Sequence, residues 1–243
     1  RRWHVSREAQ DELAYESHRR TAAAYDEGFY RDLIVEFQGL REDDNLRRDT
    51  SRERLAKLKP VFPIKGSGTL TAGNSTPMTD GASAVLLASD DWARARGLPV
   101  LAYLSYGKVA AVNFVDDEGL LMAPAYAVPR MLQDAGIGLQ DFDFYEIHEA
   151  FAAQVLCTLQ AWQSAEFCRD RLGRQDERFE GAFVDQSVDH AGGNGGLLRD
   201  IRLGADHLLV LVLLAIAGRL VLTVVEPAQD DGQAHVAVDE RDQ

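Results

Sequence analysis

The sequence has little cysteine and no apolar leader. Its only two cysteines are Cys157 and Cys168, which are too few for the disulfide framework of a small secreted domain. The N-terminal residues are polar and charged, unlike the apolar segment of a secretory signal. We therefore expect a protein of the reducing cytoplasm. Because the sequence begins with Arg1 and not with Met, we also expect the natural start to lie further upstream.

Positive charge is also scarce. The sequence has 26 Lys and Arg residues against 39 Asp and Glu residues, which gives a net charge of -13. This balance excludes a general binder of nucleic acids or of anionic membranes. It remains compatible with a local basic pocket for phosphate groups.

An uninterrupted membrane-spanning run is absent. The longest apolar stretch, from Leu208 to Val225, reaches the length of a membrane span but contains Gly218 and Arg219. An arginine inside a bilayer costs about 2.5–3.5 kcal/mol. The sequence therefore favours a buried helix followed by a buried strand, with a membrane segment as the alternative.

Patterns typical of metal and phosphate sites are missing as well. His190 and the glycines after it fit neither the ligand spacing of a metal site nor a P-loop. Cys157 lies among apolar residues of a predicted helix, where thiols are mostly unreactive. We expect no bound metal and no nucleophilic role for Cys157.

The first hundred residues predict helices, a loop and one strand. Ser6 is a suitable N-cap for a helix that ends at about Asp26. The Arg-rich residues 38–54 lack apolar periodicity and predict a surface loop. The small, apolar residues 82–88 predict a buried strand, and Ser89 is a suitable cap for a short helix after it.

Strands and helices then alternate. Residues 99–106 predict a strand, and Pro124 opens a predicted helix. Phe142 and Phe144 alternate with acidic residues, which predicts another strand. Apolar residues at helical spacing predict a helix from Ala150 onward. This alternation indicates an α/β fold.

The turn between the last of these strands and its helix holds a titratable imidazole, His148. In α/β enzymes such turns often carry reactive groups. The surrounding residues 142–154 read FDFYEIHEAFAAQ. Four further segments of interest precede this one. They are SREAQDELAYESHRRTAAA, LAKLKPVF, TAGNSTPMTDGA and LLMAPAYAVPRMLQDAGI.

In combination, these five segments resemble the thiolase family, specifically the β-oxidation type with an H-E-A-F motif. The resemblance covers about residues 1–170 and implies a layered αβαβα sandwich, here incomplete. It further implies a division into four parts. Residues 1–78 match the end of the CoA-binding loop domain and 79–98 the last strand and helix of the N-terminal half. Residues 99–170 match the start of the C-terminal half, and 171–243 form an aberrant, unassigned tail.

The composition changes after Gln175. The remaining residues include thirteen acidic residues and five arginines but no lysine or tyrosine. An out-of-frame translation of a GC-rich gene would have this composition, and the low lysine content of the whole chain fits such a gene. Residues 228–243 predict disorder.

The resemblance implies transfer of an acyl group between coenzyme A thioesters in fatty-acid degradation: 3-ketoacyl-CoA and CoA give acyl-CoA and acetyl-CoA. The family uses a nucleophilic Cys, a His in a G-H-P motif and a second Cys in C-x-G. Neither Cys157 nor Cys168 matches these cysteines, and no G-H-P is present. We therefore expect this chain to be inactive by itself. The alternative is a non-catalytic thiolase remnant that binds acyl-CoA or a partner subunit.

The resemblance also implies site residues. His148 matches the motif position that holds a water or oxyanion, and Glu149 would orient it. Thr76 matches a contact to the pantetheine arm, and Arg47 an arginine near the adenine end of CoA. CoA and acyl-CoA are then substrates, with no permanently bound cofactor. The complete protein would form a dimer or tetramer, or bind a β-oxidation partner subunit.

Overall fold

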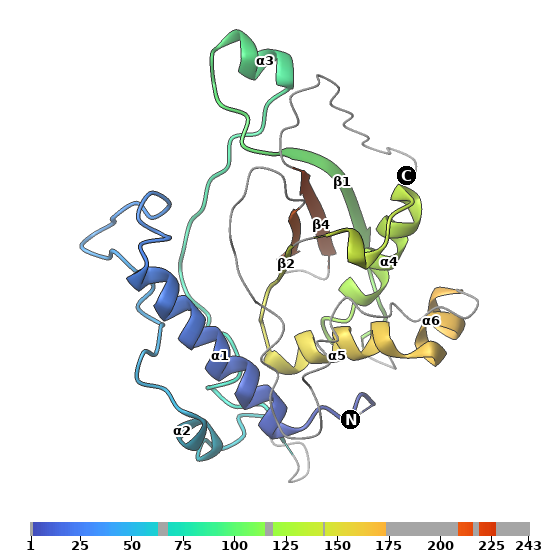
Figure 1. The fold of residues 1–243 in the computed structure, drawn as a ribbon. Coiled ribbons are helices and arrows are strands. Elements are labelled where there is room, and N and C mark those ends of the chain that lie inside the picture. Colours follow the sequence, from blue (N-terminus) through green and yellow to red (C-terminus); the bar gives the residue numbers. More distant parts are fainter. Residues whose placement is uncertain are drawn as a thin grey trace. The chain divides into compact units, whose positions relative to one another are not determined.

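The described residues belong to two compact units, whose helices and strands are drawn in Figure 1. Each unit has buried side chains of its own. The computed structural model describes residues 2–62, 68–114, 119–142, 144–173 and the backbone of 209–215 and 219–226. The described part of the first unit lies within residues 1–79 and 149–156. That of the second unit lies within residues 80–148 and 157–243.

The long helix of the first unit is α1 (Arg7–Asp26). The Ser6 hydroxyl accepts a hydrogen bond from the backbone N–H of Ala9 at 3.1 Å, and Gly28 follows the helix with a φ of 79°. Both ends obey ordinary capping chemistry. The predicted N-cap and helix end are thus confirmed.

A second, short helix begins inside the predicted surface loop. It is α2 (Arg52–Ala56), and the Ser51 hydroxyl caps it by accepting from the N–H of Arg54. Its Leu55 is buried, and α2 contacts α1. The segment is too polar for its sequence alone to predict this helix, which one buried leucine and an N-cap stabilise.

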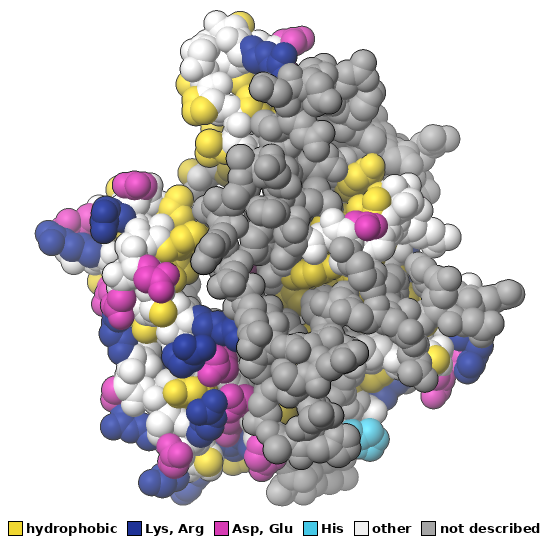
Figure 2. All heavy atoms as spheres, viewed as in Figure 1, with side chains coloured by type: hydrophobic (Ala, Val, Ile, Leu, Met, Phe, Trp, Pro, Cys, Tyr) yellow, Lys and Arg dark blue, Asp and Glu magenta, His cyan; other side chains and the backbone are white. Residues whose placement is uncertain are grey.

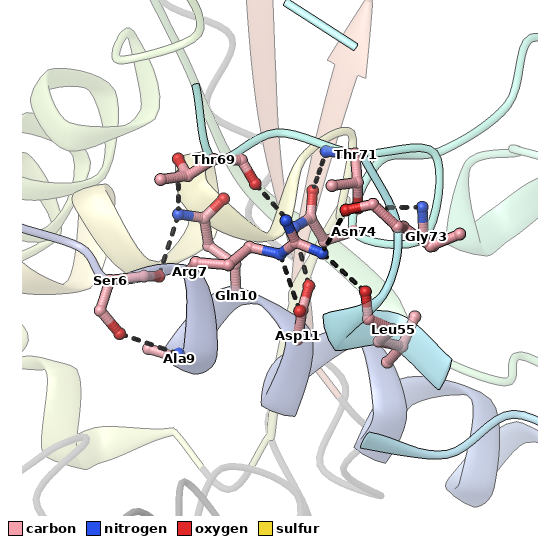
Figure 3. A network of polar contacts seen from close by, with 11 residues as sticks. Ser6, Arg7, Ala9, Gln10, Asp11, Leu55, Thr69, Thr71, Gly73 and Asn74 are labelled. Atoms are coloured by element: carbon pink, nitrogen blue, oxygen red, sulfur yellow. Dashed lines mark hydrogen bonds and ion pairs between the residues drawn. The ribbon is translucent and has the colours of Figure 1, made fainter. Parts of the chain in front are cut away.

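A buried polar network fixes the segment after α2 to α1 (Figure 3). The Asn74 amide nitrogen donates to Asp11 Oδ1 at 2.9 Å and to the Thr69 carbonyl at 3.1 Å, while its oxygen accepts from the Thr71 N–H at 2.8 Å. Asn74 and Asp11 are almost fully buried. The Asn74 side chain therefore closes a turn and ties it to the helix at once.

Arg7 extends this network to α2. Its guanidinium pairs with Asp11 at 2.7 Å and donates to the carbonyl oxygens of Leu55 and Leu58 at 2.6 and 3.2 Å. A Cβ on Gly73 would lie 2.5 Å from a methyl carbon of each of these leucines. A side chain at position 73 would therefore have to displace both leucine side chains.

The second unit contains a mixed sheet with the strand order β1-β4-β3-β2. β2 and β3 are parallel, and the other two pairs are antiparallel. The strands are β1 (Tyr103–Ala110), β2 (Phe144–Ile147), β3 (Leu209–Ala215) and β4 (Arg219–Glu226).

The two late strands correct one prediction. The apolar run from Leu208 to Val225 was expected to form a helix and then a strand, but both of its halves are strands. A continuous apolar run has no periodicity that separates a buried helix from a buried strand, and pairing with β1 and β2 decides the outcome. Among the described residues, no helix is long and apolar enough to cross a membrane.

The helices of the second unit follow the predicted pattern. α4 (Pro124–Ala135) contacts β1 and β4 and ends at Gly136, which has a φ of 69°. The other described helical elements of this unit are α3 (Asp90–Ala95), the 3-10 turn η1 (Leu139–Asp141) and α6 (Ala165–Leu172). Helix α5 (Ala152–Gln163) begins in the first unit and continues into the second from Cys157 onward. The predicted Ser89 cap is confirmed, since its hydroxyl accepts from the Trp92 N–H at 3.3 Å.

Two predicted strands differ from the structure. The strand expected at 99–106 is β1, which begins four residues later. Residues 82–88 form no strand, and Val85, Leu86 and Leu87 are 81%, 72% and 67% exposed. A buried strand needs neighbouring strands on both sides, and no described strand pairs with this segment.

A tryptophan compensates for a proline inside α4. In a regular helix the carbonyl of Ala125 accepts from the N–H of residue 129, but Pro129 has none. The indole Nε1–H of Trp162 donates to this carbonyl at 3.2 Å. Trp162 is fully buried, so the contact joins α5 to α4 and satisfies the group that the proline left unpaired.

The Asn74 network predicts a large loss of stability for a small change. Asn74→Ala leaves a buried carboxylate oxygen, a carbonyl and an N–H without their partner, which should lower the free energy of unfolding by about 2–4 kcal/mol in urea titrations. The matched control Asn45→Ala removes an exposed-loop amide with a single 3.4 Å contact and should change it by less than about 0.5 kcal/mol. Equal effects of the two changes would contradict the role of Asn74.

The hydrogen bond from Trp162 to the Ala125 carbonyl predicts that substitutions of Trp162 and Pro129 have coupled effects on stability. Trp162→Phe should lower the free energy of unfolding by at least about 1 kcal/mol more when Pro129 is present than in the Pro129→Ala background. In that background residue 129 supplies its own N–H to the Ala125 carbonyl. Thermal unfolding of the four chains of this double-mutant cycle, followed by circular dichroism, measures the difference. Additive effects would show that the indole hydrogen bond does not replace the missing donor.

Candidate functional site

The H-E-A-F motif lies where the sequence places it, between a strand and a helix. His148 follows β2 directly and is exposed, Glu149 is half-buried, and α5 begins at Ala152. An exposed imidazole at the end of a strand can donate a hydrogen bond from either ring nitrogen. The local structure thus suits the role expected of His148.

The protein backbone joins this motif to the segment that contains Thr76. The Thr76 N–H donates to the Ala150 carbonyl, and the Ala152 N–H donates to the Asn74 carbonyl, both at 3.0 Å. Ser75 and Phe151 form the antiparallel bridge between these two hydrogen bonds. Thr76 is therefore fixed beside the residue that follows Glu149, with its own side chain exposed.

Phe151 anchors this junction. Its ring meets the Phe62 ring edge to face, with centroids 6.4 Å apart. Because Ser75 and Phe151 are the non-hydrogen-bonded pair of the bridge, their side chains share one face. The Ser75 hydroxyl and both polar atoms of the Gln154 amide are buried without a hydrogen-bond partner among the described residues. Buried polar groups of this kind usually form hydrogen bonds with ordered water or with another polar group.

Sequence reasoning missed Asn74 and Gln154. Each lies inside a segment that carries the family resemblance, so the signal was present, but nothing in the residues alone separates a buried amide from an exposed one. The partners decide this point: Asp11 is 63 residues from Asn74 along the chain.

One charged group near His148 lies on the strand that precedes it. Glu146 lies two residues earlier, on the same face of an extended chain. Burial raises the pKa of the Glu146 carboxyl, and the nearby His148 opposes this shift. Burial also raises the pKa of the Tyr145 hydroxyl. Glu146 therefore lies close enough to His148 for the two side chains to interact electrostatically.

Arg47 lies apart from Thr76 within the first unit. Its backbone N–H donates to His18 Nδ1 at 3.3 Å, and its Nη1 donates to the Asp44 carbonyl at 2.9 Å. Asn74 is tied to Asp11, and the seven residues from Asp11 to His18 correspond to about 10 Å along α1. Arg47 and the turn that precedes Thr76 are thus held at different points of one helix.

Neither cysteine suits a nucleophile. Burial raises the pKa of the Cys157 thiol, which keeps it protonated at neutral pH. Cys168 is buried, and its thiol donates to the Trp162 carbonyl at 3.5 Å. Among the described residues, no cluster of three His, Cys, Asp or Glu side chains could hold a metal ion.

Two family models match the chain. The model of the thiolase N-terminal domain covers residues 1–91, and that of the thiolase C-terminal domain covers residues 98–194. The 3-ketoacyl-CoA thiolases of Pectobacterium atrosepticum and Serratia proteamaculans are each 43% identical over 176 residues. These residues make up 70% of this chain and 40% of each relative. The chain thus spans less than half the length of these curated relatives.

Solved thiolase structures are also similar to this chain. Human mitochondrial 3-ketoacyl-CoA thiolase in complex with CoA is similar with a TM-score of 0.67 at 27% identity, over 93% of this chain and 56% of that one. The dimeric peroxisomal thiolase of Saccharomyces cerevisiae has a TM-score of 0.66 at 28% identity, over 92% and 55%. The ordered motifs, the two family models and the fold together show that this chain belongs to the thiolase family.

Proposed function

We propose that this chain supplies part of a thiolase site that transfers acyl groups between coenzyme A thioesters, with 3-ketoacyl-CoA and CoA as substrates. The observation that carries the proposal is the backbone pairing of residues 74–76 with 150–152. It sets Thr76, expected at the pantetheine arm, beside Ala150, which lies two positions in the sequence after His148, the residue expected at the reacting carbonyl. A thioester substrate needs contacts of both kinds.

Each predicted residue then has a role. His148 donates a hydrogen bond to the oxygen on which negative charge develops, and Glu149 orients it. The exposed Thr76 contacts the pantetheine arm. Arg47 offers a guanidinium to the phosphate-bearing, adenine end of CoA. Its position about 10 Å along α1 from the Asn74 anchor suits a long ligand that is held at two points.

The nucleophilic thiolate is the part that these residues do not supply. Cys157 is half-buried in α5 and Cys168 is buried in α6, and they match neither family cysteine. We infer that acyl transfer belongs to the complete thiolase arrangement and that this chain alone binds CoA without turnover. A non-catalytic remnant that binds acyl-CoA or a partner subunit is the second candidate, favoured by the missing G-H-P motif.

Further properties follow from the family. CoA is a substrate, a proposal supported by the thiolase structures in complex with CoA, and we propose no resident cofactor beside it. Assembly into a dimer is supported by the dimeric yeast relative. We further propose that the complete protein forms a tetramer or binds a β-oxidation partner subunit. The two free cysteines support a cytoplasmic location.

The CoA contact predicts a selective loss of binding. Arg47→Ala should weaken CoA binding about tenfold in isothermal titration calorimetry, because a charge-assisted hydrogen bond contributes about 1.5–3 kcal/mol. Arg41→Ala removes an exposed arginine from the same loop, paired only with Glu36 among the contacts described here, and should leave the affinity within about twofold. Equal losses of CoA affinity in the two variants would show that Arg47 acts only through its charge and makes no specific contact with CoA.

The missing nucleophile predicts an absence of turnover. The purified chain should produce no acetyl-CoA from acetoacetyl-CoA and CoA above the buffer rate, because neither thiol is activated. Formation of acetyl-CoA would contradict this, and its loss in Cys157→Ala or Cys168→Ala would identify the nucleophile.

A further inference from the structure

The loop that carries Arg47 is fastened to α1 at three points. This Arg47 loop comprises residues 41–51. The Asp43 N–H donates to the Tyr25 hydroxyl at 2.9 Å, and Arg48 pairs with Asp26 at 2.8 Å. The third contact runs from the Arg47 N–H to His18 Nδ1 at 3.3 Å. It is the one that holds Arg47 itself.

This third contact depends on the protonation state of His18. Nδ1 accepts a hydrogen bond only in the neutral imidazole that carries its proton on Nε2. Protonation turns Nδ1 into a donor that faces another donor, the Arg47 N–H. It also sets a positive charge beside the Arg47 guanidinium.

The surroundings of His18 favour the neutral form. From the loop, Arg47 and Asp43 face the imidazole, and on α1 the positions three and four residues away (Ala14, Tyr15, Thr21, Ala22) carry no charge at neutral pH. Burial and then Arg47 lower the pKa of His18, while Asp43 opposes them. At pH 7 the imidazole is therefore neutral and can accept from Arg47.

We propose that His18 is a positioning residue for Arg47: its neutral imidazole holds the loop in place for the phosphate-bearing end of CoA, and protonation releases it. The proposal rests on the proposed function, since Arg47 is the CoA contact. On the face shown in Figure 2, basic and acidic side chains are interspersed around α1 and α2, so phosphate recognition there depends on the placement of individual side chains.

The sign of the pH effect follows from the lowered pKa. The unfolded chain binds a proton at His18 near pH 6.5, the ordinary value, while the folded chain does so only at lower pH. The contribution of His18 to stability is therefore complete above pH 6.5 and falls as the pH drops through the interval between the two pKa values. Loop release and loss of CoA affinity should follow the same direction.

The test compares the chain with His18→Asn and His18→Leu. The Asn amide oxygen can replace Nδ1 as an acceptor but does not titrate, whereas Leu has no acceptor. CoA affinity is measured by calorimetry at pH 7.5 and 5.5. CoA has a phosphomonoester that itself titrates near pH 6, so the informative quantity is the ratio between variants and not the pH effect of one chain.

The unchanged chain should lose about fivefold more affinity between pH 7.5 and 5.5 than His18→Asn does, the size expected for one hydrogen bond. His18→Leu should bind about fivefold more weakly at pH 7.5. The same pH ratio in the unchanged chain and in His18→Asn would overturn the proposal, as would full affinity in His18→Leu.

An NMR titration separates this proposal from the proposed function. The Arg47 backbone amide shift should follow the His18 titration in the unchanged chain and show no such step in His18→Asn. If the Arg47 amide shift does not change as His18 titrates, the positioning role is wrong even where CoA binds. If no variant binds CoA at either pH, the proposed function fails and the ligand role of His18 fails with it, whatever the amide reports.

Discussion

The first unit depends on one buried side chain, Asn74. Its amide closes the turn from Thr69 to Asn74 and binds the Asp11 carboxylate on α1, and Arg7 carries the same network to α2. The backbone carbonyl of Asn74 then accepts from Ala152 at the start of α5. One residue thus connects three elements, and both polar atoms of its side-chain amide have hydrogen-bond partners, as a buried amide requires.

This arrangement explains why Thr76 is exposed yet fixed. Its neighbour Asn74 points inward to Asp11 while Ser75 pairs with Phe151, so two residues of an extended segment are held and the third is presented outward. A ligand contact of this type loses little conformational freedom on binding, because the backbone is already ordered. The same logic applies to Arg47, whose backbone is held while its side chain remains exposed.

Much of the local structure could be predicted from the sequence. The caps Ser6 and Ser89 and the helix start at Pro124 depend on bonds between residues three or four apart, so they are visible in the sequence. The position of His148 at a strand-to-helix turn was predictable for the same reason. The strand expected at 82–88 failed, because an apolar run becomes a buried strand only when other strands pair with it.

The sequence by itself determined the family, the order of helices and strands around the H-E-A-F motif, and the candidate residues His148, Glu149, Thr76 and Arg47. Tertiary structure alone decided which polar groups are buried and paired. Asp11 meets Asn74, Trp162 supplies the donor that Pro129 lacks, and the run after Leu208 forms strands. These outcomes rest on contacts between residues far apart in the chain, where neither spacing nor local propensity carries information.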